Sequence, residues 1–423
     1  MMKLSKRKIL SHFVVLQFVI QVVFIHSGSA LAQVPVESLQ DELSSYLEAS
    51  AEGLTANDIK NLNQERNKDI SNAYENYFVA KKNVSIARSA LNPINTGLIL
   101  GVSLGATYLW APIALNALLS LPTKIYNIGK NEALANAQYW YRLQARELLN
   151  TEAVKLYYDI LTNEFILKSI DLEVSLYNSL SESLAQNSEE NAARISEING
   201  TILALQKESL VIHDTVIKER AALRTMLSYG PDRQLVLSQD DRVLTKVLDD
   251  TLDDNDLSHV AFKNSREYKA KYWIYQASIK NLKMVRWSLI SINGLNFSYG
   301  QRVKIAKSEK AVAYDEMIMT GKAVKNAAVD SLGQLHYTFK LQEISRDKSS
   351  DSLNFSAGIR TNFENNLLSY ADYIMTAVSA IRDYRSFVMA HYQTLGKIED
   401  MNLTLGKDIE YSQEGVLDLG SIF

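Results

Sequence analysis

Long stretches of the chain combine apolar residues at helical spacing with few helix breakers. The composition predicts helices over residues 57–91, 126–186, 190–228, 258–286 and 301–349. One apolar stripe of the second predicted helix is made by Ala153, Leu156, Tyr157, Ile160 and Leu161. Such a stripe predicts packing against neighbouring helices. After residue 228, Gly230 and Pro231 predict the end of a helix, because glycine caps it and proline cannot continue it.

Residues 95–121 change to a period of two. The residues expected on the apolar face are Leu98, Leu100, Val102, Leu104, Ile113, Leu115 and Leu119. Small or polar residues largely occupy the alternate positions, and Trp110 to Pro112 would connect two strands. One apolar face is what a β-barrel strand needs against lipid. The alternative is a transmembrane helix, since the run is uncharged, but Pro112 and the glycine spacing favour strands.

A second interruption is shorter. Residues 288–292 and 295–299 flank Asn293-Gly294, the strongest short-range signal for a hairpin. Strands of this length fall short of the roughly 9–11 residues that span a membrane. Whether the second hairpin crosses a membrane therefore stays open.

The two halves of the chain resemble each other. Asn67 matches Asn264 at an offset of 197, and Ala153 matches Ala323 at an offset of 170. Each half is predicted to consist of a helix, an interruption and another helix. The predicted organisation is a signal peptide (1–32), a first repeat (33–232), an acidic linker (233–257), a second repeat (258–410) and a tail (411–423).

The N-terminus predicts export. Lys3, Lys6, Arg7 and Lys8 precede an apolar run, and Ala30 to Ala32 form an A-x-A cleavage site. The formal charge of −3 includes these four cations, so the mature chain carries −7, which argues against nucleic acid as a partner. The chain has no Cys, and its 5 Pro and 17 Gly in 423 residues favour long helices.

Catalytic and metal-binding motifs are missing from the sequence. The 6 histidines form no H-E-x-x-H, and no P-loop or G-x-S-x-G occurs. The acidic stretch from Asp249 to Asp254 lacks the glycine and the terminal glutamate of a calcium loop, which predicts a solvated linker. We therefore expect no enzyme, no cofactor and no metal site.

Five passages in order resemble the TolC-like outer-membrane factor family. They run from Glu65 to Pro93, from Leu119 to Gly129, from Ala221 to Pro231, from Asn264 to Ala270, and from Phe355 through Ala371 to Tyr384. The last is the most specific and is similar to the family's turn at the periplasmic tip. The match covers about residues 55 to 405. The chain departs from the family in its short second hairpin and in a first tip, residues 186–195, without glycine.

The resemblance implies a mainly α protein, a long-helix α-barrel of two tandem repeats, each interrupted by a β-hairpin. As a homotrimer it would form a 12-stranded β-barrel in outer-membrane lipid with a helical extension into the periplasm. The implied function is a passive exit duct of a tripartite efflux pump or type I secretion system. Its partners would be a periplasmic adaptor (membrane fusion protein) and an inner-membrane transporter. By the same resemblance, Arg360, Glu364 and Phe355 fall on positions of the periplasmic gate.

Two other classes of protein remain open. A helical pore-forming toxin also hides an apolar segment among long helices, but it predicts a soluble monomer without a repeat. A periplasmic helical scaffold fits the short second hairpin. The exported substrate is not encoded in any motif of the sequence.

Overall fold

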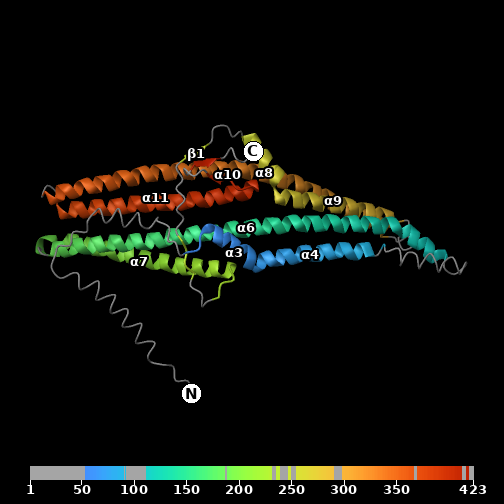
Figure 1. Cartoon of the computed structure of the whole chain (residues 1–423), viewed down its shortest axis with the longest axis horizontal. Coiled ribbons are helices and arrows are strands. Elements are labelled where there is room, and N and C mark those ends of the chain that lie inside the picture. Colours follow the sequence, from blue (N-terminus) through green and yellow to red (C-terminus); the bar gives the residue numbers. More distant parts are fainter. Residues whose placement is uncertain are drawn as a thin grey trace, which may run out of the picture.

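The structure is a computed structural model that describes residues 53–89, 91, 111–185, 188–230, 235–238, 246–248, 254–289, 298–365, 369–411 and 416–418. The predicted signal peptide lies outside these residues. The described part is an elongated, mainly helical molecule whose long helices run side by side (Figure 1).

The first half begins with two short helices and continues with two long ones. They are α3 (Ala56–Arg66), α4 (Lys68–Ser89), α6 (Ala111–Ala185) and α7 (Ser188–Met226). Thr55 starts α3 with a capping box, in which its hydroxyl accepts from the Asp58 N–H and the Asp58 carboxylate accepts from the Thr55 N–H. α6 has 75 residues and is therefore about 110 Å long.

The second half repeats this order with α8 (Asp254–Asn264), α9 (Arg266–Trp287), α10 (Tyr299–Glu364) and α11 (Tyr370–Leu405). α3 and α8 both have 11 residues, and α4 and α9 both have 22. The helix starts of α4 and α9 are 198 residues apart, one more than the offset from matching residues. Because helix boundaries vary by a residue or two between equivalent elements, the two offsets agree.

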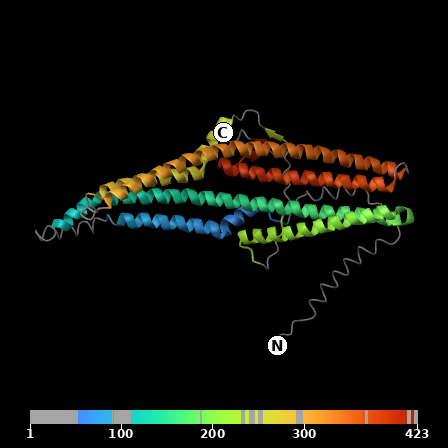
Figure 2. The ribbon, with the colours of Figure 1, turned by 180° about the vertical axis from the view of Figure 1, so that it is seen from behind.

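The helices form one layer. α6 lies between α7 and α11, and α11 lies between α6 and α10; towards the other end α4, α6, α9 and α10 follow one another (Figures 1 and 2). The end of α6, the start of α7, the end of α10 and the start of α11 lie at one end of the molecule, which we call the tip end (Figure 1). The end of α4, the start of α6, the end of α9 and the start of α10 meet at the other, which we call the base end.

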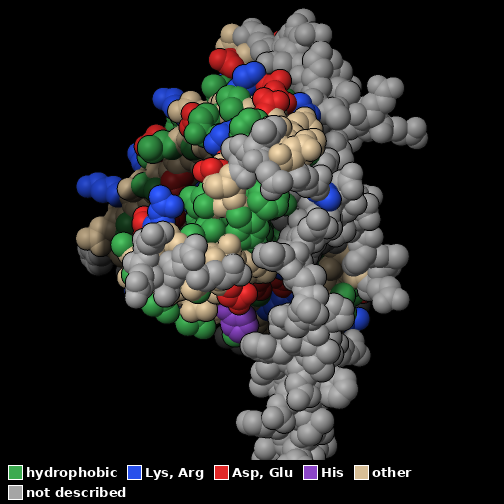
Figure 3. All heavy atoms as spheres, turned by 90° about the vertical axis from the view of Figure 1, so that its left-hand side faces the viewer, with side chains coloured by type: hydrophobic (Ala, Val, Ile, Leu, Met, Phe, Trp, Pro, Cys, Tyr) green, Lys and Arg blue, Asp and Glu red, His purple; other side chains and the backbone are tan. Residues whose placement is uncertain are grey.

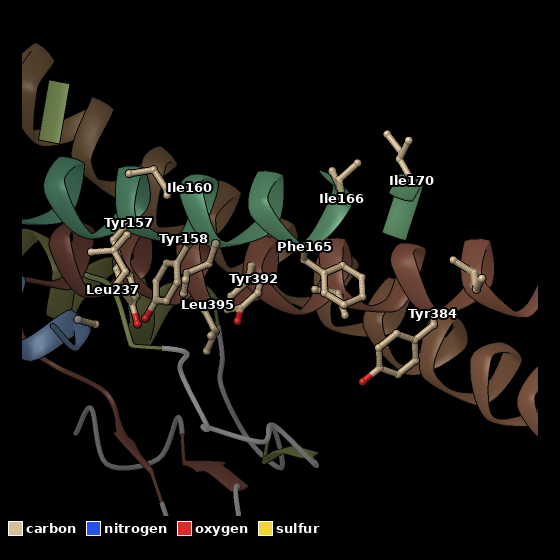
Figure 4. Packing of buried hydrophobic residues seen from close by; sticks show 14 of the residues in the cluster. Tyr157, Tyr158, Ile160, Phe165, Ile166, Ile170, Leu237, Tyr384, Tyr392 and Leu395 are labelled. Atoms are coloured by element: carbon tan, nitrogen blue, oxygen red, sulfur yellow. The ribbon is translucent and has the colours of Figure 1, made fainter. Parts of the chain in front are cut away.

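The core follows the seam between the two halves. Tyr158 of α6 stacks on Tyr392 of α11 with ring centroids 6.0 Å apart, and Phe165 packs against Tyr384 at 5.7 Å (Figure 4). The hydroxyl of buried Tyr157 donates to the Ser238 carbonyl over 2.6 Å. Leu54 pairs with Leu237 beside this bond, so the segments before α3 and after α7 are joined at mid-length.

The prediction of a second strand in the first hairpin is wrong. α6 already begins at Ala111, so Ile113, Leu115 and Leu119 lie in a helix. Pro112 stands in the first turn, where its missing N–H costs no hydrogen bond. The alternation of Ala with Leu is equally compatible with a helix, because both residues are strong helix formers. Leu98, Leu100, Val102 and Leu104 lie outside the described residues, as do residues 290–297 of the second predicted hairpin.

The linker is also more ordered than predicted. β1 (Lys246–Leu248) lies inside it and pairs in parallel with β3 (Val416–Asp418), which pairs antiparallel with β2 (Glu410–Tyr411). The sheet order is therefore β1-β3-β2, and it joins the linker to the predicted tail. α8 begins at Asp254, four residues before the expected start of the second repeat.

Candidate functional site: the tip, the seam and the edges of the helical layer

Hydrogen bonds cap the end of α10 and the start of α11. The Asn365 N–H donates to the Thr361 carbonyl over 3.1 Å and ends α10. Ser369 begins α11, because its hydroxyl accepts from the Asp372 N–H over 3.2 Å. The ring of Phe363 stacks on that of Tyr373 at 5.3 Å across the turn. The two helix ends at the tip are thus defined by residues of α10 and α11 close to them.

Tyr370 ties this turn to the first half of the chain. Its ring lies 5.7 Å from that of Phe363, and its hydroxyl bonds Ser179 of α6. Burial raises the pKa of the Tyr370 hydroxyl, although the bond to Ser179 acts in the opposite direction. The tip end of α10 and α11 is therefore in contact with α6.

The predicted gate residues lie on the last turns of α10. Phe355 is 64% exposed, and Arg360 is half-buried. Glu364 is the last residue of α10, one turn beyond Arg360, but its side chain lies outside the described part. The structure thus brings the three residues to the tip end, while a contact between Arg360 and Glu364 stays a prediction. Viewed from this end, cationic, acidic and hydrophobic side chains are mixed (Figure 3).

A buried carboxylate holds the two halves together near the tip. Glu173 of α6 is fully buried and pairs with Arg382, 3.0 Å away, and with Arg385, both on α11. Arg385 also donates from Nε to the Ser169 hydroxyl over 2.7 Å. Burial disfavours the charge of Arg382, but Glu173 and Tyr177 together outweigh it and raise the pKa of that guanidinium.

The same seam extends to α10 through Asp383. Its carboxylate pairs with Lys348 at 2.7 Å and accepts from the Ser352 hydroxyl over 2.6 Å. We call Glu173, Arg382 and Arg385 the seam triad. The seam triad could not be predicted from the sequence, because a single acid in a helix gives no signal of burial. The available sign was that Ser169 and Glu173 lie one turn apart on an otherwise apolar stripe.

Both outer edges of the layer carry exposed apolar side chains at heptad spacing. On α7 they are Leu203, Leu210 and Ile217, with exposed fractions of 66, 73 and 54%. On α10 they are Ile305, Val312 and Met319, followed nearer the tip by Tyr337 and Ile344. A repeat of seven is typical of a helix that packs against another helix.

The described residues contain neither a cluster suited to a metal ion nor a membrane-spanning helix. In this part of the chain no group of three His, Cys, Asp or Glu side chains is placed to hold a metal ion. Among the described helices none is both long and apolar enough to cross a membrane.

Solved structures with a similar fold include two outer membrane channels and CusC, whose structures concern transmembrane channel formation. The structure of CusC has a TM-score of 0.63 and 10% identity, covering 83% of this chain and 92% of that one. The open state of the MtrE outer membrane channel from Neisseria gonorrhoeae has a TM-score of 0.61 and 11% identity, covering 83% and 89%. For the CmeC outer membrane channel of Campylobacter jejuni the TM-score is 0.58, with 11% identity and coverage of 83% and 85%.

These likenesses confirm the resemblance at the level of the fold: the chain has the fold of the TolC-like outer-membrane factors. No protein-family model matches the sequence, and a search of curated proteins finds no relative. The helical part of the predicted fold class is therefore confirmed, whereas the β-barrel part is not shown.

Proposed function

We propose that the chain is a subunit of an outer-membrane exit duct that assembles as a homotrimer and serves a tripartite efflux pump or a type I secretion system. The observation that carries the proposal is the helical layer with two apolar edges. A lone layer of this kind leaves hydrophobic stripes in water, which marks an interaction surface. The fold of the three channels described above supports the same function.

The two edges differ, and this favours a ring. One edge consists of α4 and α7 stacked end to end, and the other is α10 along its whole length. When identical subunits contact each other through two unlike surfaces, the same contact repeats from subunit to subunit. The subunits form a closed ring when the rotation between neighbours allows it. At helix spacings of about 10 Å, three layers of four helices would enclose a tunnel rather than a solid bundle. The number three comes from the family resemblance.

The two ends of the layer suit different surroundings. At the base end the sequence has two uncharged runs, from Ser89 to Thr123 and from Trp287 to Gln301. We assign this end to outer-membrane lipid. At the tip end the surface is mixed in charge, and the turns between the helices are where a periplasmic adaptor and an inner-membrane transporter would meet the duct. The duct itself would be a passive conduit.

Cross-linking tests the assembly, and the chain is suited to it because it has no Cys. Contacts across the layer place Arg220 of α7 level with Lys348 of α10: Arg220 pairs with Glu164, the adjacent Phe165 packs on Tyr384, and Asp383 pairs with Lys348. Leu210 and Phe355 lie about 15 Å and about 10 Å further towards the tip. Leu210→Cys with Phe355→Cys, treated with a short bis-maleimide, should give covalent dimers and trimers on a denaturing gel.

The control pair is Leu210→Cys with Met389→Cys. Met389 is 44% exposed but belongs to α11, which is an inner helix of the layer. This pair should stay monomeric on the gel. A chain that is a monomer in detergent-free buffer and cross-links with neither pair would exclude the duct and favour a pore-forming toxin or a periplasmic scaffold.

A further inference from the structure

The base end is strongly basic, although the mature chain as a whole is acidic. The end of α9 and the start of α10 carry Lys280, Lys283, Arg286, Arg302, Lys304, Lys307 and Lys310. Glu309 is the one acid between Lys280 and Lys310. Both uncharged runs are also flanked directly by cations, the first by Arg88 and Lys124 and the second by Arg286 and Arg302. Positive charge is thus concentrated where the uncharged segments begin and end.

Part of this charge lines a groove of about 490 Å³ between α9 and α10. Leu282 and Ala311 contribute apolar surface, and the rings of Tyr275 and Tyr314, 5.3 Å apart, border it. The polar lining consists of the three cations Arg286, Lys307 and Lys310. The groove therefore combines positive charge with an apolar wall.

These three cations have no acidic partner within the described residues. The ion pair seen at this end joins Arg88 to Glu132, at 2.6 Å. The Glu309 carboxylate instead accepts from the Asn281 amide over 2.9 Å and does not line the groove. Three neighbouring cations without a carboxylate repel one another, so an anion in the groove would lower the free energy of the site.

The aromatic residues at the base end indicate the surroundings of the groove. Trp287 ends α9 and is 40% exposed, and Tyr299 begins α10. The Tyr299 hydroxyl donates to the Arg286 carbonyl over 3.3 Å, which holds the two helix ends together beside the groove. Exposed Trp and Tyr are enriched where a protein passes from water into a membrane.

Resting on the proposed function, we infer that the groove between α9 and α10 binds the phosphate of an anionic phospholipid in the periplasm-facing leaflet. Arg286, Lys307 and Lys310 would hold the phosphate oxygens. Leu282, Ala311 and the two tyrosines would contact the glycerol and the first methylene groups. Basic residues next to a membrane segment are the usual partners of anionic headgroups.

The test uses the full chain purified in detergent and phosphatidylglycerol in mixed micelles, with phosphatidylcholine as the neutral lipid. The variant is the triple substitution Arg286→Gln, Lys307→Gln and Lys310→Gln. At low salt the wild type should prefer phosphatidylglycerol, and the variant should lose about 100-fold in affinity for it, because each cation near an anionic surface contributes roughly a factor of five. Affinity for phosphatidylcholine should not change.

The matched control removes three exposed cations elsewhere, with Lys207→Gln, Lys322→Gln and Lys340→Gln. An equal loss in this control would overturn the inference, since net charge alone would then explain binding. Displacement of phosphatidylglycerol by equimolar inorganic phosphate would assign the groove to free phosphate and exclude the lipid. The cross-linking pair separates the two proposals: normal trimers without a preference for phosphatidylglycerol refute the lipid site alone, and a preference without trimers refutes the duct alone.

Discussion

Replacing Glu173 should test how the two halves are held together near the tip. Glu173→Ala removes the one carboxylate of the seam triad and leaves Arg385, whose side chain is 13% exposed, without its counter-charge. Removing one partner of a buried ion pair costs about 3–5 kcal/mol, because the remaining charge stays desolvated. We expect a loss of about 3 kcal/mol in the free energy of unfolding.

The two arginines should contribute unequally. Arg382 has a side-chain exposure of 49%, so water screens its pair with Glu173, and Arg382→Ala should cost less than about 1 kcal/mol. Arg385→Ala leaves Glu173 fully buried with one half-exposed partner and should cost about 3 kcal/mol. The double replacement Glu173→Leu with Arg385→Met removes both buried charges and should recover most of the stability.

The assay is urea unfolding of the full chain in detergent, followed by circular dichroism. All variants are compared at one protein concentration, because assembly adds to the apparent stability. Glu152→Ala is the control, since Glu152 lies on the same helix but is exposed. Equal costs for Arg382→Ala and Arg385→Ala would contradict the role given to burial, and so would a Glu173→Ala variant that is no less stable than Glu152→Ala.

Two further predictions concern the tip and the core. In a planar bilayer, Arg360→Ala should raise the single-channel conductance and shift ion selectivity towards cations, because it removes a positive charge from the predicted gate. Arg346→Ala, further from the tip on α10, should change neither the conductance nor the selectivity. If both variants gave the same conductance and selectivity, Arg360 would have no role in the gate. Burial raises the pKa of Tyr384 to about 12 from 10.0, so its contribution to stability is complete below pH 10 and is lost as the pH rises towards 12. The wild type should lose about 2 kcal/mol more than Tyr384→Phe over this interval, and identical losses in alkaline unfolding curves would contradict the burial argument.

The sequence determined the helices and the order in which they occur. The predicted helix 190–228 lies within two residues of α7 at both ends, whereas the predicted helix 258–286 is divided in the structure into α8 and α9. The matching segments indicated that the second half repeats the first. The resemblance to a known family placed the tip turn at residues 358–361, but α10 continues through them to Glu364. These features depend on residues close together along the chain, and local spacing therefore carries the information.

The local sequence pattern did not predict the structure where two conformations are compatible with it. The alternating residues 113–121 fit a strand or a helix, and the structure continues α6 through them. The break between α3 and α4 is another case. Asn67 ends α3 while its side-chain oxygen accepts from the Asp69 N–H over 2.8 Å, and its amide group donates to Asn63, which in turn bonds Asn150 of α6. A partner 87 residues away fixes this break, which the sequence had predicted as one helix.

Tertiary structure alone decided the seam triad, the small sheet and the edges of the layer. Glu173, Arg382 and Arg385 are common helix residues until α6 and α11 meet and exclude water from the carboxylate. Lys246–Leu248 forms a strand only because Val416–Asp418 supplies the hydrogen-bonding partner. The heptad residues of α7 and α10 are visible in the sequence, but their exposure depends on which faces the neighbouring helices cover, and burial is a property of the packed molecule rather than of any one segment.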